Sequence, residues 1–245
     1  MNKVALVLGG NGGIGNSAVK RLVEDGFQVC ATYFKHKDKL KEIETELSSN
    51  EISLFQCDLI NEDEVNKIIS NINSTFGEID VVVFAVTSAI KNARVLKLDW
   101  DEYNSHFDIQ IKPMLFVMKA LSEQINAKYE TKFIVLLTEY CIGSPPKGLS
   151  NYVTSKYAAM GMAKTMAIEL SQYNSTVNMI SPGMVETPLL DSLPAKLIEL
   201  TSHQNPLRRN ALPDDVSNTI SFLASDQSDY LNGANIVING GGIMQ

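Results

Sequence analysis

The feature that most constrains this sequence is a run of glycines directly after a short apolar segment. Val4 to Leu8 leads into Gly9-Gly10-Asn11-Gly12-Gly13-Ile14-Gly15, and apolar residues of helical spacing follow. A strand, a glycine turn and a helix start together form an anion site, because free amide groups point at a diphosphate that the missing side chains let approach. The segment therefore predicts a dinucleotide site. Two registers fit, Gly10-x-Gly12-x-x-Gly15 and Gly9-x-x-x-Gly13-x-Gly15, and the sequence leaves both open.

Short apolar runs alternate with longer segments of helical period along the rest of the chain. This alternation is typical of strand-helix units that build a parallel sheet covered by helices on both faces. We therefore expect a doubly wound parallel sheet, a three-layer α/β/α Rossmann fold, in a single domain over residues 1–245. One predicted helix starts after Asn61, which has the spacing of a capping box with Glu64. The predicted strands are Val4–Leu8, Phe27–Tyr33, Ile52–Cys57, Ile79–Val86, Phe133–Thr138, Thr176–Ile180 and Asn235–Ile238.

The charge and cysteine content narrow the class of protein. The chain has 21 Lys and Arg against 28 Asp and Glu, a formal net charge of −7, which disfavours binding to nucleic acid or to an anionic membrane. The apolar run before the glycines is too short for a signal peptide or a membrane span, which predicts a cytoplasmic protein. The three cysteines and three histidines are widely separated, so we expect reduced, buried thiols and no metal site.

The end of the second predicted strand indicates which nicotinamide cofactor the glycine loop would bind. An acidic residue there would hold the adenosine ribose hydroxyls of NAD and repel the extra phosphate of NADP. The segment Thr32-Tyr33-Phe34-Lys35-His36-Lys37 has no acid and two lysines. We therefore expect NADP, with NAD as the alternative.

A second motif, Asn151-Tyr152-Val153-Thr154-Ser155-Lys156, starts a predicted helix that continues to Leu170. Tyr152 and Lys156 are four residues apart and so share one face of that helix. A neighbouring ammonium group lowers the pKa of a phenol from its usual value of about 10. We therefore predict that Tyr152 is a general acid or base with a lowered pKa. Such a pair is common on helix surfaces, and it becomes specific because it follows a dinucleotide loop.

With both motifs present, the sequence resembles the single-domain short-chain dehydrogenase/reductase family nearly from end to end, and within it the 3-oxoacyl-[acyl carrier protein] reductases. The resemblance implies an NAD(P)(H)-dependent oxidoreductase that transfers hydride between the cofactor and a small carbonyl or alcohol substrate. Tyr152 would exchange a proton with the substrate oxygen, and Lys156 would hold the nicotinamide ribose. The further matching segments are Cys57-Asp58-Leu59, Ser181-Pro182-Gly183, Thr187-Pro188, Asn205-Pro206-Leu207, Pro213-Asp214-Asp215-Val216, Phe222-Leu223-Ala224-Ser225 and Gly233 to Gly241.

The resemblance also implies a set of cofactor contacts and an oligomer. Asp58 would contact the adenine, and Thr187 would contact the nicotinamide end. The family suggests a homo-oligomer, a dimer or a tetramer, built partly on helices around residues 103–127 and 152–172. The full set of implied cofactor contacts is Gly9, Asn11, Gly13, Ile14, Gly15, Tyr33, Lys35, Asp58, Leu59, Ala85, Tyr152, Lys156, Pro182, Gly183, Val185 and Thr187.

The sequence departs from the family pattern at the predicted active site. The family places a serine at the end of the fifth strand to bind the substrate carbonyl, whereas an ungapped alignment puts Glu139 there, with Thr138 beside it. A threonine hydroxyl can donate the same hydrogen bond, but an ionised glutamate cannot. Either Thr138 takes the role, or Glu139 is protonated, or the carbonyl chemistry is weak. The family asparagine of the fourth main helix is replaced by Gln110, and the family motif Asn-Asn-Ala-Gly is replaced by Phe84-Ala85-Val86-Thr87.

A leucine-rich segment could cover the substrate. Residues 187–212 contain six leucines and isoleucines before Asn205, which suit either an apolar lid or a peripheral helix. A lid would suit an acyl or other lipophilic ketone, and reduction is the favoured direction. The alternative function is a cofactor-binding protein that has lost efficient catalysis and serves as a sensor or an assembly subunit.

Overall fold

A parallel sheet runs through the computed structural model, which describes residues 2–47 and 51–244. Seven strands in these ranges pair in the order β3-β2-β1-β4-β5-β6-β7, and all neighbouring strands in this order are parallel. The predicted Rossmann fold is therefore confirmed. The strands are β1 (Val4–Leu8), β2 (Gln28–Tyr33), β3 (Ile52–Gln56), β4 (Val81–Phe84), β5 (Lys132–Leu136), β6 (Thr176–Pro182) and β7 (Asn235–Ile238).

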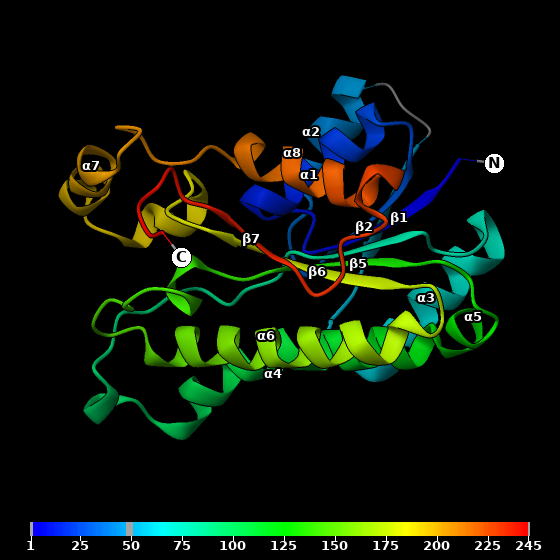
Figure 1. Ribbon diagram of the computed structural model, residues 1–245, viewed down its shortest axis with the longest axis horizontal. Coiled ribbons are helices and arrows are strands. Elements are labelled where there is room, and N and C mark those ends of the chain that lie inside the picture. Colours follow the sequence, from blue (N-terminus) through cyan, green and yellow to red (C-terminus); the bar gives the residue numbers. More distant parts are fainter. Residues whose placement is uncertain (1, 48–50, 245) are drawn as a thin grey trace.

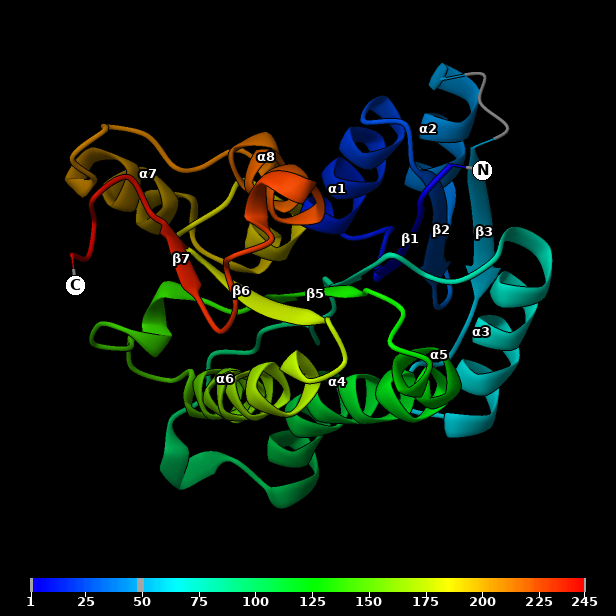
Figure 2. The same ribbon diagram turned by 45° about the vertical axis from the view of Figure 1, so that its right-hand side comes forward.

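Helices cover both faces of this sheet (Figure 1). One layer contains α1, α2 and α8, and the other contains α3, α4, α5 and α6, whereas α7 lies beyond the edge of the sheet, near the C-terminus (Figures 1 and 2). The helices are α1 (Gly13–Glu24), α2 (Asp38–Leu47), α3 (Glu62–Phe76), α4 (Trp100–Ala120), α5 (Ser122–Asn126), α6 (Ser150–Ser171), α7 (Ala195–Gln204) and α8 (Pro213–Ala224). Short 3-10 turns, η1 (Val95–Lys97), η2 (Glu139–Cys141), η3 (Pro188–Ser192) and η4 (Asp226–Ser228), complete the described elements.

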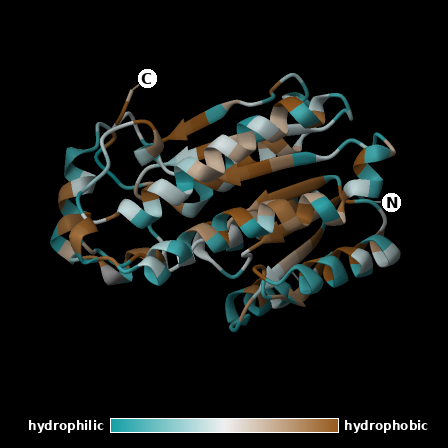
Figure 3. Cartoon of the chain, turned by 90° about the horizontal axis from the view of Figure 1, so that it is seen from below, coloured by the Kyte–Doolittle hydropathy of each residue, from teal (hydrophilic) through white to brown (hydrophobic). Residues whose placement is uncertain are grey.

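Alternate residues of each strand supply two separate apolar cores. In β1, Leu6 and Leu8 pack in the core under α3, α4 and α6, whereas Ala5 and Val7 pack in the core under α1, α2 and α8. Successive side chains of a strand point to opposite faces, so a strand buried on both faces is apolar throughout. The hydrophobic strands lie between helices whose outer faces are hydrophilic (Figure 3).

The structure corrects some predicted boundaries. β4 ends at Phe84, before the predicted end at Val86, because Val86 leaves the sheet and its carbonyl accepts a hydrogen bond from Gln110. β6 extends to Pro182, two residues past the predicted end. Asn61 caps α3 as predicted, but Glu64 accepts from the Asn61 side chain and the Asp58 amide, so the capping box is incomplete.

The order of the strands fixes where a ligand can bind. The chain crosses from β3 to β4 on the other side of β1, so the connections after β1 and β4 leave in opposite directions. Ligands of doubly wound folds bind in the crevice at this switch point, at the carboxyl ends of the strands. The glycine loop follows β1, Thr138 follows β5, and Gly183 follows β6, so these segments meet at one edge.

No helix in the described ranges is long and apolar enough to cross a bilayer. The cytoplasmic location, and the absence of nucleic-acid and membrane partners, stay predictions.

All three cysteines are buried and free, as predicted. Burial raises the thiol pKa to about 12 for Cys30 and Cys57 and to about 11 for Cys141. Among the described residues, no group of His, Cys, Asp and Glu side chains is placed to hold a metal ion.

Candidate active site

The glycine loop after β1 makes contacts that favour one of the two possible registers. Gly9 has a φ of +80°, and a side chain there would meet the Ala85 carbonyl oxygen at 2.8 Å. A Cβ on Gly13 would lie 2.4 Å from the Thr187 side chain, and one on Gly15 would lie 2.3 Å from the Gly9 carbonyl oxygen. A Cβ on Gly12 meets nothing closer than 3.3 Å. A Cβ on Gly10 would lie 2.9 Å from the Ala31 Cβ, so Gly10 is restricted as well, and the wider register, Gly9-x-x-x-Gly13-x-Gly15, accounts for the close approaches at Gly9 and Gly13.

The same loop leaves the start of α1 open to an anion. α1 begins at Gly13, and its N-cap residue, Gly12, forms no side-chain cap. The first amide groups of a helix have no partner within the helix, and they carry the positive end of its dipole. Thr32 anchors the loop, since its hydroxyl and its carbonyl accept from the Gly9 and Gly10 amides at 3.1 and 2.9 Å.

A cavity of about 660 Å³ opens between this loop and the ends of β2, β3 and β4. It brings together seven of the cofactor contacts that the resemblance implied, including Asp58, which was expected at the adenine: Gly9, Asn11, Tyr33, Lys35, Asp58, Leu59 and Ala85. Phe34 and Lys35 are exposed at its rim, and the Lys35 ammonium lies 5.3 Å from the centre of the Phe34 ring. The glycine cradle, the open helix start and the size of the cavity fit a dinucleotide.

A second, smaller cavity lies on the other side of the loop. Its volume is about 120 Å³, and its lining is mainly apolar. Five of the implied cofactor contacts line it, including Thr187, which was expected at the nicotinamide end: Ile14, Pro182, Gly183, Val185 and Thr187. The hydroxyl-bearing residues Thr138, Tyr140 and Tyr152 line it as well. The structure thus brings most of the predicted site residues to two neighbouring cavities.

Tyr152 and Lys156 occupy the first turns of α6, and both are buried. The Lys156 Nζ donates hydrogen bonds to the Gln110 Oε1 at 2.9 Å and to the Leu136 carbonyl at 2.7 Å. It lies 6.0 Å from the centre of the Tyr152 ring. Gln110 also donates from Nε2 to the Val86 carbonyl at 2.7 Å, so it connects α4, the segment after β4 and Lys156.

The predicted lowering of the Tyr152 pKa is wrong. Burial raises the pKa of this phenol to about 12, and a hydrogen bond with the Thr138 side chain opposes that change only in part. The Lys156 ammonium does not reverse the effect, because it is held by Gln110 and the Leu136 carbonyl. Burial also lowers the pKa of Lys156 to about 8. At neutral pH, Tyr152 is therefore protonated and able to donate.

The structure places Thr138 and Glu139 in different cavities, whereas the sequence left open which of the two lies beside Tyr152. Thr138 is buried and lines the cavity of Tyr152, and its side chain acts to lower the pKa of the Tyr152 phenol. Glu139 begins the turn η2 and lines a different cavity, where its Oε2 accepts from the Asn239 Nδ2 at 3.1 Å. Of these two side chains, Thr138 is therefore the one that shares a cavity with Tyr152.

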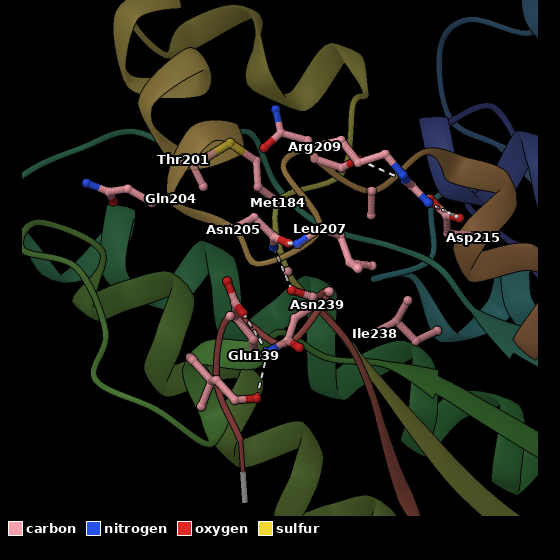
Figure 4. A pocket seen from close by; sticks show the side chains of 16 residues that line it. Glu139, Met184, Thr201, Gln204, Asn205, Leu207, Arg209, Asp215, Ile238 and Asn239 are labelled. Carbon is pink, nitrogen blue, oxygen red and sulfur yellow. Dashed lines mark hydrogen bonds and ion pairs between the residues drawn. The ribbon is translucent and has the colours of Figure 1, made fainter.

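Glu139 lines a polar cavity of about 340 Å³ (Figure 4). Asn239, at the end of β7, donates to Glu139 and to the Ile243 carbonyl, and its own carbonyl accepts from the Asn205 side chain. These bonds join the turn after β5, the C-terminal segment and the end of α7. Sequence reasoning missed Asn239 because its partners are far apart along the chain.

The segment after Thr187 covers the Tyr152 cavity only in its first part. Leu189, Leu190 and Leu193 line that cavity, whereas Leu197 and Leu200 of α7 are exposed. The predicted apolar lid over residues 187–212 therefore stays a prediction for the segment around η3. Arg208 and Arg209 follow α7, and Arg209 is bound by the Asp215 carboxylate.

The analysis of the sequence also overlooked His106. It is buried in α4, one turn before Gln110, and its ring lies edge-on to the Tyr152 ring with centroids 6.3 Å apart. Burial lowers its pKa, and the nearby Lys156 charge acts in the same direction. A neutral imidazole therefore packs against Tyr152. The four-residue spacing from Gln110 was the signal that could have indicated it.

The comparisons with known proteins cover nearly the whole chain. Residues 9–242 match the family described as enoyl-(acyl carrier protein) reductase. A 3-oxoacyl-[acyl-carrier-protein] reductase of Staphylococcus epidermidis is 32% identical over 247 residues, covering 98% of this chain and 99% of the relative. The solved structure described as ElxO with NADP bound has a TM-score of 0.89 and 26% identity, covering 100% of both chains. A short-chain type dehydrogenase/reductase from Mycobacterium marinum has a TM-score of 0.91 and 27% identity, covering 99% of this chain and 96% of the other.

Proposed function

This chain belongs to the short-chain dehydrogenase/reductase family, and on that premise we propose that it reduces an acyl or other lipophilic ketone to an alcohol with NADPH. The observation that carries the proposal is that Thr138 and Tyr152, two hydroxyl-bearing side chains, line the same apolar cavity next to the glycine loop. A carbonyl oxygen placed at this pair would meet two hydroxyl donors. Stabilising the negative charge that develops on that oxygen is the main catalytic requirement of carbonyl reduction.

The protonation state of Tyr152 supports reduction over oxidation. Since burial raises its pKa to about 12, the phenol carries its proton at neutral pH and can transfer it to the substrate oxygen. When bound, NADPH supplies the hydride that the carbonyl carbon accepts. Lys156, with a pKa lowered to about 8, can return a proton to Tyr152 near neutral pH. Overall, one ketone, one NADPH and one proton give one alcohol and one NADP⁺.

The proposed cofactor residues follow from the two cavities. Gly9, Gly13, Gly15 and the start of α1 would hold the diphosphate. Tyr33, Lys35, Asp58, Leu59 and Ala85 would surround the adenosine, and the ribose near the nicotinamide would lie by Tyr152 and Lys156. Lys35 and Lys37 follow β2, and no acidic side chain stands between Thr32 and Lys37. These charges favour the extra phosphate of NADPH. The similar solved structure of ElxO with NADP bound supports the same choice.

We expect NADPH to bind at least several-fold more tightly than NADH. The gap should shrink as the salt concentration rises, because exposed charge pairs are screened. Isothermal titration calorimetry at low and high salt measures both effects. A Lys35→Ala, Lys37→Ala double variant should bring the two affinities together, with Lys41→Ala on the exposed face of α2 as the control. Equal affinities for the unaltered chain at low salt would refute the NADP assignment.

A screen of ketones and alcohols tests the reaction itself. We expect NADPH absorbance to fall when aliphatic ketones or 3-oxoacyl thioesters are added, and the rate to rise with the length of the apolar chain. The reason is the apolar lining that Leu149, Leu189, Leu190 and Leu193 give to the cavity of Tyr152. A chain that binds NADPH but consumes none with any ketone would favour the alternative, a cofactor-binding protein without efficient catalysis.

A homo-oligomer is also part of the proposal. Four large apolar side chains on α4 and α6 are exposed: Trp100 at 71%, Leu115 at 45%, Tyr157 at 47% and Ile168 at 77%. Both helices were expected to form the interface between subunits. Covering these side chains with a second copy would remove apolar surface from water.

A further inference from the structure

The polar cavity of Figure 4 adjoins the proposed substrate site. Gly183 and Met184 line both this cavity and the apolar cavity of Tyr152. The neighbouring residues Thr138 and Glu139 each line one of the two. A substrate whose carbonyl binds Thr138 can therefore extend a substituent of a few bonds toward Glu139.

Glu139 places a carboxylate in this cavity without a cationic partner. One oxygen, Oε2, accepts from Asn239, and the carboxylate points toward the space below Thr201, Gln204 and Asn205 (Figure 4). In the described ranges, no Lys, Arg or His side chain forms an ion pair with Glu139. The side chain is half-buried, and burial raises its pKa. A partly desolvated carboxylate with unfilled acceptor positions interacts strongly with a cation that can reach it.

The basic side chain that lines this cavity is already occupied. Arg209 donates from Nη1 and Nη2 to the Asp215 carboxylate at 2.5 and 2.9 Å, and from Nη1 to the Asn210 carbonyl at 3.0 Å. Its charge is therefore compensated within the protein. An anionic substituent entering the cavity would meet Glu139 and find no free cation, whereas a cationic N–H donor would find an acceptor.

From these contacts we infer that Glu139 is a specificity residue and that the substrate is a ketone carrying an alkylammonium group a few bonds from its carbonyl. The carbonyl oxygen binds at Thr138 and Tyr152, and the ammonium N–H donates to the Glu139 carboxylate. This inference rests on the proposed reductase function and names the substrate class for that site.

The test uses pairs of methyl ketones that differ only at the far end of the chain. One member ends in a dimethylammonium group, which carries one N–H and cannot condense with its own ketone, and the other ends in the neutral isopropyl group. For spacers of three to six methylenes, we expect kcat/KM at neutral pH to favour the cationic member about ten- to a hundredfold at the best length, the usual effect of one charge-assisted hydrogen bond. A carboxylate-ended ketone should be the poorest substrate.

Glu139→Gln should remove most of this preference, because glutamine keeps an acceptor for Asn239 but carries no charge. Glu199→Gln is the matched control: it removes one charge from exposed α7 nearby, where Glu199 lies 3.8 Å from His203, and it should leave the preference intact. The inference would be overturned if the ratio of kcat/KM for the cationic ketone to that for the neutral ketone were near one in the unaltered chain. It would also be overturned if this ratio were the same in Glu139→Gln as in the unaltered chain.

The inference and the proposed function can fail separately. Turnover of the neutral ketones without any cationic preference would overturn only the role of Glu139. If no ketone is reduced, the ammonium site can still be tested by calorimetry, which measures how tightly the dimethylammonium ketone binds to the NADP⁺-loaded chain. Binding that weakens about tenfold in Glu139→Gln would support the ammonium site while the reductase proposal fails, and equal binding to both chains would refute the site.

Discussion

The Tyr152→Phe variant should reduce ketones about a thousandfold more slowly than the unaltered chain, the usual scale for losing a general acid. The substitution removes the hydroxyl whose proton goes to the substrate oxygen. It keeps the ring that packs edge-on against His106, so the start of α6 should stay in place. NADPH affinity should change less than twofold. Steady-state kinetics and calorimetry on the same preparation measure the two quantities.

The matched control for this prediction is Tyr140→Phe. Tyr140 lines the same cavity and loses the same hydroxyl, but its bond with Thr138 comes from its backbone amide, which donates to the Thr138 Oγ1 at 3.5 Å and is kept in the variant. We expect it to keep most of its activity. If Tyr152→Phe retained more than about a tenth of the rate, a loss of under about 1.4 kcal/mol in barrier, Tyr152 would not be the acid.

The second large effect is expected at Thr138. Thr138→Val keeps the shape of a buried side chain but removes the hydroxyl that faces Tyr152, and the loss of one such donor typically lowers the rate by about 10² to 10³. The effect should fall on kcat, because the bond strengthens as negative charge develops on the carbonyl oxygen. Stopped-flow measurement of a single turnover separates this step from product release.

Thr138→Ser is the control, since it keeps a hydroxyl and should retain activity within about tenfold. A silent Thr138→Val together with an inactive Glu139→Gln would contradict the assignment. That outcome would make Glu139 the acid or base, despite its position in the cavity of Asn239.

The fold could be predicted because its signals are local. The strand β1 is apolar throughout because both of its faces are buried, and the glycines follow it at the point where a side chain would meet Ala85, Thr187 or Gly9. Tyr152 and Lys156 could be placed together because four residues make about one helical turn. The predicted strand boundaries were wrong where the chain leaves the sheet earlier than expected, as at Val86.

The remaining features of the site depend on contacts that spacing does not encode. The choice between Thr138 and Glu139 is decided by how the chain turns into η2, where Thr138 caps the turn and Glu139 meets Asn239 from the opposite end of the sequence. Burial raises the pKa of Tyr152, and this effect outweighs the lowering that the sequence predicted from the nearby Lys156 charge. Gln110 reaches Lys156 directly, a bond that only the packing of α4 against α6 reveals.

The central claim is that this chain transfers hydride from NADPH to a ketone carbon. NADPH that carries deuterium at the transferable position of its nicotinamide tests it directly, with mass spectrometry of the alcohol formed from an accepted ketone. The account predicts one deuterium on the carbinol carbon for each NADPH consumed, and almost none formed by Tyr152→Phe. NADPH that binds tightly but yields no labelled alcohol with any ketone would contradict the claim and leave a nucleotide-binding protein in its place.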